Sequence, residues 1–142
     1  RISDILNLRL ADIVRDGDRY RLEITEQKTQ KKRIFTVPLI IQQYIENYCL
    51  RNGIGKNEKI FELTERAVSK QLALVCDYLG LEGVGTHSFR KWYATEIYKN
   101  NGYDITLVQR LLQHSSSAIT QRYIGIEPQR IEAAIEGHAQ LL

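Results

Sequence analysis

The fold is decided by residues 86–123, which read THSFRKWYATEIYKNNGYDITLVQRLLQHSSSAITQRY. Thr86 is placed to cap a helix over about 87–99, which ends at the polar, glycine-containing segment 100–102. Asp104 is placed to cap a second helix, whose apolar residues recur at helical spacing: Ile105, Val108, Leu111 and Leu112. Three serines at 115–117 interrupt the pattern and cap a short helix that reaches Tyr123. This part of the chain is therefore expected to form three helices joined by tight turns.

The first half of the chain changes from a strand pattern to a helix pattern. Tyr20, Leu22 and Ile24 alternate with polar residues, a second alternating stretch covers 34–37, and the basic segment 26–33 between them is expected at a hairpin tip. Helical spacing follows, with one predicted face made of Ile41, Tyr44, Ile45, Tyr48 and Cys49, and a further helix predicted between Thr64 and Gly80. The predicted fold class is α+β, mostly helical, with a small antiparallel β-sheet near the N-terminal part.

Composition places the 142 residues among soluble globular domains, with 43% hydrophobic and 26% charged residues. No apolar run approaches the roughly 18 residues that span a bilayer. Cys49 and Cys76 lack metal-ligand spacing, so both are expected to be buried thiols in a reducing cytosol. The net charge of +3 is weak evidence for a polyanionic partner, but the basic residues gather in one stretch, at Lys28, Lys31, Lys32 and Arg33.

Several residues with catalytic side chains are ambiguous when each is taken alone. His87 and Arg90 share a face at a helix start, where free amides favour an anion, but such a pair also occurs on ordinary surfaces. His114 and Tyr123 would usually be packing residues, and Lys28 could be no more than a solvated residue at the hairpin tip.

Read together and in order, these residues resemble the active-site pattern of the tyrosine recombinases, the phage integrase family. The stretches that carry the resemblance are Arg1-Ile2-Ser3-Asp4, Lys28-Thr29 with Val37-Pro38-Leu39, Thr86-His87-Ser88-Phe89-Arg90, Leu111-Leu112-Gln113-His114, and Thr120-x-x-Tyr123. The likeness covers residues 1 to about 126. Gln113 departs from the glycine that is usual there, and the stretch from Lys28 to Pro38 is slightly long, which leaves Lys31 as an alternative for the catalytic lysine.

The resemblance implies an enzyme that cleaves and rejoins DNA through a 3′-phosphotyrosine on Tyr123, without metal, ATP or another cofactor. It implies that Arg1, Arg90 and His114 bind the phosphate, that Lys28 protonates the leaving 5′ oxygen, and that His87 either assists proton transfer near Tyr123 or holds the site together. DNA contacts are expected from Lys31, Lys32, Arg33 and Lys91, mainly to phosphates.

The resemblance also implies a single C-terminal catalytic domain over 1–142, with a core at 1–126 and a helix at 127–142 that either folds back or docks on a neighbouring protomer. The family's N-terminal DNA-clamping domain is absent from this sequence. The expected partners are double-stranded DNA and further copies of the chain, as a tetramer, with no membrane. The expected location is the cytoplasm of a bacterium or phage host, at the nucleoid.

Three other interpretations remain open at this point. A type IB topoisomerase shares the same chemistry, a DNA-binding module could carry an inactive site, and a helical interaction domain could match the motifs by coincidence. The sequence specifies neither the DNA target nor a choice among integration, excision, inversion and dimer resolution.

Overall fold

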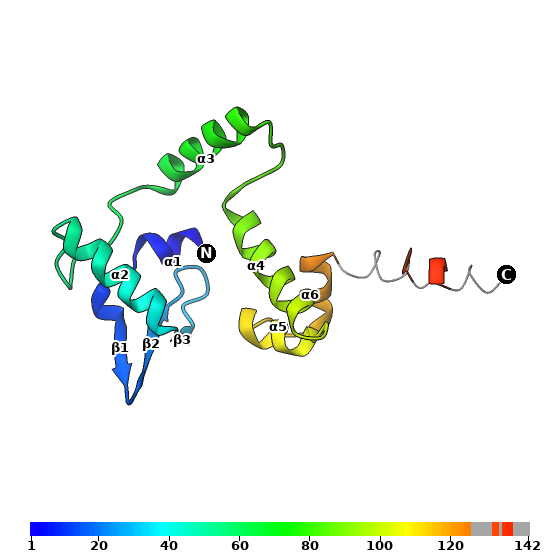
Figure 1. The fold of residues 1–142 in the computed structure, drawn as a ribbon, viewed down its shortest axis with the longest axis horizontal. Helices are drawn as coiled ribbons and strands as arrows, with labels where there is room; N and C mark the ends of the chain where they lie inside the picture. Colours follow the sequence, from blue (N-terminus) through cyan, green and yellow to red (C-terminus); the bar gives the residue numbers. More distant parts are fainter. Residues whose placement is uncertain (126–131, 134, 138–142) are drawn as a thin grey trace. The chain divides into compact units, whose positions relative to one another are not determined.

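The computed structural model describes residues 1–125, 132–133 and 135–137. The chain divides into two compact units, Arg1–Thr86 and His87–Leu142. Figure 1 shows the elements of each unit along the chain. The first unit contains the sheet, and the elements described in the second are all helices.

The first unit is built from a short N-terminal helix, a three-stranded sheet and two longer helices. Its elements are α1 (Ile2–Leu6), the 3-10 helix η1 (Leu10–Asp12), β1 (Ile13–Asp16), β2 (Arg19–Thr25), β3 (Lys32–Val37), α2 (Leu39–Arg51) and α3 (Glu65–Leu79). The strands are antiparallel in the order β1-β2-β3, and α2 contacts β2. The predicted hairpin is therefore the β2–β3 pair. The additional strand β1 was not predicted, because four residues are too few to establish an alternating pattern.

The register of β2 and β3 decides which side chains lie on the inner face. Tyr20 pairs with Val37, Leu22 with Phe35 and Ile24 with Arg33. Successive strand residues point to opposite faces, so these pairs share one face. All six of these side chains are buried or partly buried, whereas Glu23, Ile34 and Thr36 of the opposite face are exposed.

Helices α2 and α3 begin and end where the sequence predicts, but the buried side of α2 differs from the prediction. Its buried residues are Gln42 and Cys49, whereas Tyr44 is 71% exposed and Ile41 47% exposed. Gln42, Ile45 and Cys49 also form a stripe with helical spacing. The apolar pattern alone predicted the neighbouring stripe, because it gave no weight to the polar Gln42. Helix α3 begins at Thr64, whose hydroxyl accepts from the Ala67 amide, and ends at a left-handed Gly80.

The second unit consists of α4 (Thr86–Asn100), α5 (Ile105–Leu112) and α6 (Ser117–Ile124). Asp104 caps α5 by accepting from the Thr106 and Leu107 amides, as predicted, and Ser116 caps α6. Helix α4 begins at Thr86 itself, one residue before the predicted start. The core gathers residues of all three helices: Ala94, Tyr98, Val108, Leu112 and Ile124. The helix predicted at 127–142 lies largely outside the described residues.

The predicted fold class is confirmed: the described chain is mostly helical with a small antiparallel sheet near its N-terminus. Cys49 and Cys76 are buried free thiols, also as predicted. Among the described helices, none has the length and apolar character needed to span a membrane.

Candidate active site

His114 and Tyr123 face each other because the chain reverses direction after α5. Gln113 adopts a left-handed conformation with φ of 54°, which ends α5 and turns the chain back. The His114 amide donates to the Gln109 carbonyl over 3.0 Å, so the residue after the turn stays attached to the helix. Helix α6 then returns along α5, and the His114 and Tyr123 rings meet edge to face, with centroids 5.5 Å apart at 78°.

His114 is oriented by Thr120, which lies on α6 one turn before Tyr123. The His114 Nδ1 atom lies 3.0 Å from the Thr120 Oγ1 atom, and Thr120 is fully buried. The same hydroxyl lies 3.4 Å from the Ser116 carbonyl. One ring nitrogen of His114 is therefore committed to a buried partner, which fixes the orientation of the ring.

The Tyr123 hydroxyl is buried, and it has no hydrogen-bond partner among the described residues. A buried phenol normally has a partner, so an unpaired one calls for an explanation. A hydroxyl that must react with a substrate is one such explanation. Tyr123 is the penultimate residue of α6, directly before Ile124 and the left-handed Gly125.

Arg90 lies against the end of α5, next to the segment that carries His114. Its Nη2 atom donates to the Leu112 carbonyl over 3.4 Å, and the side chain is partly buried. His87 is exposed, one helical turn before Arg90 on α4. The second unit therefore brings Arg90, His114 and Tyr123 together around the α5–α6 turn.

The first unit holds the other two predicted catalytic residues, Arg1 and Lys28. The Arg1 Nη1 atom lies 2.8 Å from the Glu26 Oε1 atom. Lys28 is exposed in the turn between β2 and β3. That turn is closed by two backbone hydrogen bonds, from the Glu26 amide to the Lys31 carbonyl and from the Gln30 amide to the Glu26 carbonyl.

Glu26 is a buried carboxylate with three partners. Besides Arg1, its Oε1 atom lies 2.6 Å from the Arg33 Nε atom, and its Oε2 atom accepts a hydrogen bond from the Thr29 hydroxyl over 2.5 Å. Burial alone raises the pKa of this carboxyl, but its interactions with Thr29, Arg33 and Arg1 outweigh burial and lower the pKa from 4.5 to about 2. Glu26 is therefore ionised throughout the neutral range.

The four expected DNA contacts are placed differently from one another. Lys31, Lys32 and Lys91 are exposed. Arg33 is only 6% exposed and is ion-paired with Glu26, which argues against its expected role as a phosphate contact. The physical reason is that β3 begins at Lys32, so Arg33 alternates with Phe35 and Val37 onto the inner face instead of extending from the tip.

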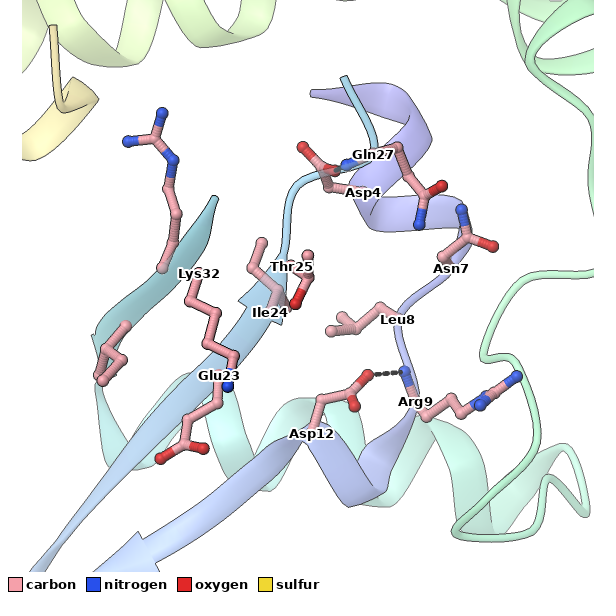
Figure 2. Close-up of a pocket in the computed structure, with 12 residues that line it drawn as sticks. Asp4, Asn7, Leu8, Arg9, Asp12, Glu23, Ile24, Thr25, Gln27 and Lys32 are labelled. Atoms are coloured by element: carbon pink, nitrogen blue, oxygen red, sulfur yellow. Dashed lines mark hydrogen bonds between the residues drawn. The ribbon is translucent and has the colours of Figure 1, made fainter. Parts of the chain in front are cut away.

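A polar cavity of about 470 Å³ lies between the segment that contains α1 and η1 and the strands β2 and β3. Figure 2 shows Asp4 and Gln27 side by side at its upper end, with Asp12, Glu23 and Lys32 further down. The Gln27 backbone amide donates to the Asp4 Oδ1 atom over 3.1 Å. The turn that carries Lys28 is therefore fastened to the helix that follows Arg1.

Comparison with known proteins decides the family. The sequence model described as the phage integrase family matches residues 1–130 of this chain. The chain belongs to the phage integrase family.

Relatives within the phage integrase family carry recombinase names. The probable integrase/recombinase YoeC of Bacillus subtilis (strain 168) is 35% identical over an alignment of 142 positions, which covers 94% of this chain and 75% of YoeC. The tyrosine recombinase XerA of Pyrococcus furiosus is 26% identical over an alignment of 144 positions, gaps included, which covers 96% of this chain and 49% of XerA. The chain thus spans three quarters of the first relative and about half of the second.

Solved structures of the same kind share this integrase fold. The crystal structure of the XerH site-specific recombinase bound to its difH substrate, a pre-cleavage complex, matches with a TM-score of 0.69 and 26% identity, over 95% of this chain and 42% of XerH. The XerA recombinase crystal structure matches with a TM-score of 0.64 and 23% identity, over 97% of this chain and 53% of XerA. The predicted membership of an enzyme family that cleaves and rejoins DNA is confirmed.

Two residues of this integrase site carried no predicted role. Thr120 belongs to the quoted Thr-x-x-Tyr motif, but nothing in the sequence indicated that its hydroxyl meets His114. Glu26 had a clearer signal, because it continues the alternating series of Tyr20, Leu22 and Ile24 and so points inward. An acidic residue at an inward position beside a basic segment predicts an ion pair.

Proposed function

We propose that this integrase-family chain is the catalytic domain of a site-specific DNA recombinase that cleaves and rejoins DNA through a 3′-phosphotyrosine at Tyr123. The observation that carries the proposal is the cluster of Arg90, His114 and Tyr123 around the α5–α6 turn, with the Tyr123 hydroxyl unpaired among the described residues. This combination supplies a nucleophile and two phosphate-binding side chains at one place.

The proposed reaction is a phosphoryl transfer in two reversible halves. The Tyr123 phenolic oxygen attacks the scissile phosphorus, His87 assists the transfer of the phenolic proton to water, and the bond from phosphorus to the 5′ oxygen breaks. Lys28 gives that leaving oxygen its proton. The aryl phosphodiester conserves the energy of the broken bond, so a 5′ hydroxyl can reverse the step and rejoin the DNA without ATP.

Charge stabilisation is the main requirement of such a transfer. Arg1 and Arg90 each offer a planar fork of N–H donors, which suits two non-bridging oxygens better than a lysine does. His114 adds a hydrogen bond, and its ring is already held by Thr120. No metal ion enters this scheme, in which two guanidinium groups provide the positive charge.

DNA binding, assembly and location are parts of the same proposal. The exposed Lys31, Lys32 and Lys91 would contact phosphates of double-stranded DNA in the cytoplasm. Four copies would hold two duplexes, with the helix proposed at 127–142 docking on a neighbouring copy or folding back. An N-terminal domain outside this sequence would clamp the DNA and supply much of the sequence recognition.

Covalent trapping tests the nucleophile. The full-length protein is incubated with a nicked duplex that carries the sequence it enriches from a random DNA pool, and the products are separated on a denaturing gel. The expected result is a protein–DNA adduct that Tyr123→Phe abolishes. Tyr78→Phe is the matched control, because Tyr78 is 90% exposed on α3 and should leave the adduct intact.

Two other outcomes would change the assignment. Binding to the enriched DNA without any adduct would favour an inactive binding module. An adduct accompanied by relaxation of supercoiled DNA, but never by strand exchange between two sites, would favour a type IB topoisomerase.

A further inference from the structure

The most unusual feature of the first unit is a buried carboxylate that serves two arginines. Glu26 is 3% exposed, and its Oε1 atom lies 2.8 Å from the Arg1 Nη1 atom and 2.6 Å from the Arg33 Nε atom. Its Oε2 atom is occupied by the Thr29 hydroxyl. A carboxylate this deeply buried is tolerated only when it is paired and hydrogen-bonded, and here both oxygens are satisfied.

The contact to Arg1 restrains a side chain that is otherwise long and mobile. A free arginine samples many rotamers, and ordering it at the moment of reaction would cost conformational entropy. Glu26 holds one end of the Arg1 guanidinium through Nη1, while the Arg1 side chain remains 26% exposed. A guanidinium carries five N–H donors, so one contact to a carboxylate leaves others for a phosphate.

Glu26 does not pair with Arg1 alone. Its carboxylate contacts two guanidinium groups, those of Arg1 and Arg33. Arg1 is the more exposed of the two arginines, with 26% of its side chain exposed against 6% for Arg33. Because the negative charge of Glu26 also acts on Arg33, it does not cancel the charge of Arg1 alone, and Arg1 keeps part of its electrostatic attraction for a phosphate.

Glu26 also stands at the start of the turn that carries Lys28. Its backbone closes that turn through Lys31 and Gln30, and its side chain binds Thr29, the residue directly after Lys28. The next residue, Gln27, is fastened to Asp4 on α1. One residue thus links the start of α1, where Arg1 stands, to the base of the β2–β3 turn.

From these contacts we propose that Glu26 is a positioning residue, which holds the Arg1 guanidinium ready for the scissile phosphate. The inference rests on the proposed function, since it presumes that Arg1 acts on that phosphate. Glu26 itself touches neither DNA nor the reacting atoms. Its effect on the reaction passes through Arg1.

Cleavage of two DNA substrates by Glu26→Gln separates this role from a general structural one. The first is the natural phosphodiester, and the second is a methylphosphonate, in which a methyl group replaces one charged oxygen at the cleaved position. Glu26→Gln in the full-length protein should slow adduct formation on the phosphodiester by on the order of 10²–10³. The methylphosphonate has no negative charge to stabilise, so the variant should fall behind wild type there by less than about tenfold.

Three control variants are measured alongside Glu26→Gln. Glu23→Gln makes the same chemical change at an exposed position of β2, paired only at the surface with Arg21, and should cleave like wild type. Glu26→Asp keeps the charge with a shorter side chain and should recover part of the lost rate. In an Arg1→Ala background, Glu26→Gln should cause little further loss, because residues that act as a unit are non-additive.

Thermal melting and DNA binding are measured on every variant, and Glu26→Asp replaces Glu26→Gln in the assays if the latter does not fold. Equal losses on the two substrates, or full additivity with Arg1→Ala, would overturn the positioning role. Wild-type cleavage with an unimpaired Glu26→Gln would also overturn it while leaving the proposed function intact. If wild-type protein forms no adduct on DNA that it binds, the proposed function fails instead.

Discussion

The Nδ1 atom of His114 lies 3.0 Å from the Oγ1 atom of Thr120, a residue with no exposed surface. The hydroxyl has a single proton, and it can give that proton to His114 or to the Ser116 carbonyl, which is 3.4 Å away. If Thr120 donates to Nδ1, the neutral imidazole carries its own proton on Nε2, where it can be donated to a phosphate. Thr120 therefore bears on which nitrogen of His114 is a donor.

Removing the Thr120 hydroxyl should impair cleavage more than folding. Thr120→Val preserves shape but leaves Nδ1 without its partner, and we expect adduct formation to slow by about 10- to 100-fold, the equivalent of one lost buried hydrogen bond. Thr120→Ser retains the hydroxyl and should stay within about threefold of wild type. Single-turnover rates on nicked DNA provide the measurement. Equal losses in both variants would mean that the methyl group matters and the hydroxyl does not.

Acid should destabilise the protein through Glu26. The pKa of this carboxyl is about 2 in the folded chain and 4.5 for an ordinary glutamate, so its contribution to stability is complete above about pH 4.5 and disappears as the pH falls toward 2. The difference corresponds to about 3 kcal/mol, as an order of magnitude. Urea unfolding at pH 7 and at pH 3 measures it. Glu26→Gln should be less stable at pH 7 and lose less on acidification, and an unchanged pH dependence would contradict this assignment.

The turn after α5 should be improved by glycine. Gln113 has φ of 54°, a conformation that costs an L-residue roughly 1–2 kcal/mol and costs glycine almost nothing. The greater freedom of glycine in the unfolded chain offsets part of this, so Gln113→Gly should add about 0.5–1 kcal/mol. The melting temperature should rise by about 2–4 °C. Arg110→Gly, at an exposed position inside α5, is the matched control and should instead lose about 1 kcal/mol.

The exposed lysines at the end of the β2–β3 turn and the start of β3 should contribute to DNA affinity without regard to sequence. Neutralising Lys31 and Lys32 together should reduce the slope of log K against log salt by about 1.8, and it should weaken binding to every duplex alike. Fluorescence anisotropy over a salt series gives the slope. The pair Lys56→Gln and Lys59→Gln removes the same charge from exposed positions elsewhere in the unit. A similar change from that pair would mean that total charge, and not the turn, controls binding.

Most of the architecture could be predicted from local signals. Asp104, Ser116 and Gly80 act as helix boundaries through their own side-chain or backbone chemistry, and each does so in the structure. The exposure of Tyr44 could not be predicted, because apolar spacing on α2 fits two overlapping stripes and the choice depends on what lies against the helix. Tertiary packing therefore determines which of the two stripes of α2 is buried.

The candidate site likewise has some features that the local sequence predicts and others that depend on tertiary packing. His114 and Tyr123 are nine residues apart, and the turn at Gln113 is enough to bring their rings together. The burial of Arg33 depends on where β3 begins, and the segment's basic composition concealed the strand alternation that Arg33 obeys. Glu26 could have been found by extending the alternation one step beyond Ile24. The contact between Thr120 and His114 depends on how α6 is rotated against α5, which spacing does not determine.

The cluster around Glu26 divides the β2–β3 hairpin into positions that protein engineering can exchange and positions it must keep. Glu26 and Arg33 are buried and paired, and Thr29 binds Glu26 through its hydroxyl, whereas Gln27, Lys31 and Lys32 are exposed and make no hydrogen bond or ion pair with the Glu26 carboxylate. A library randomised at Gln27, Lys31 and Lys32 would alter the surface offered to DNA, while the contacts of Glu26 with Thr29 and Arg33 preserve the loop. These three positions can therefore be exchanged as a set, and we expect substitutions there to leave the folding yield unchanged.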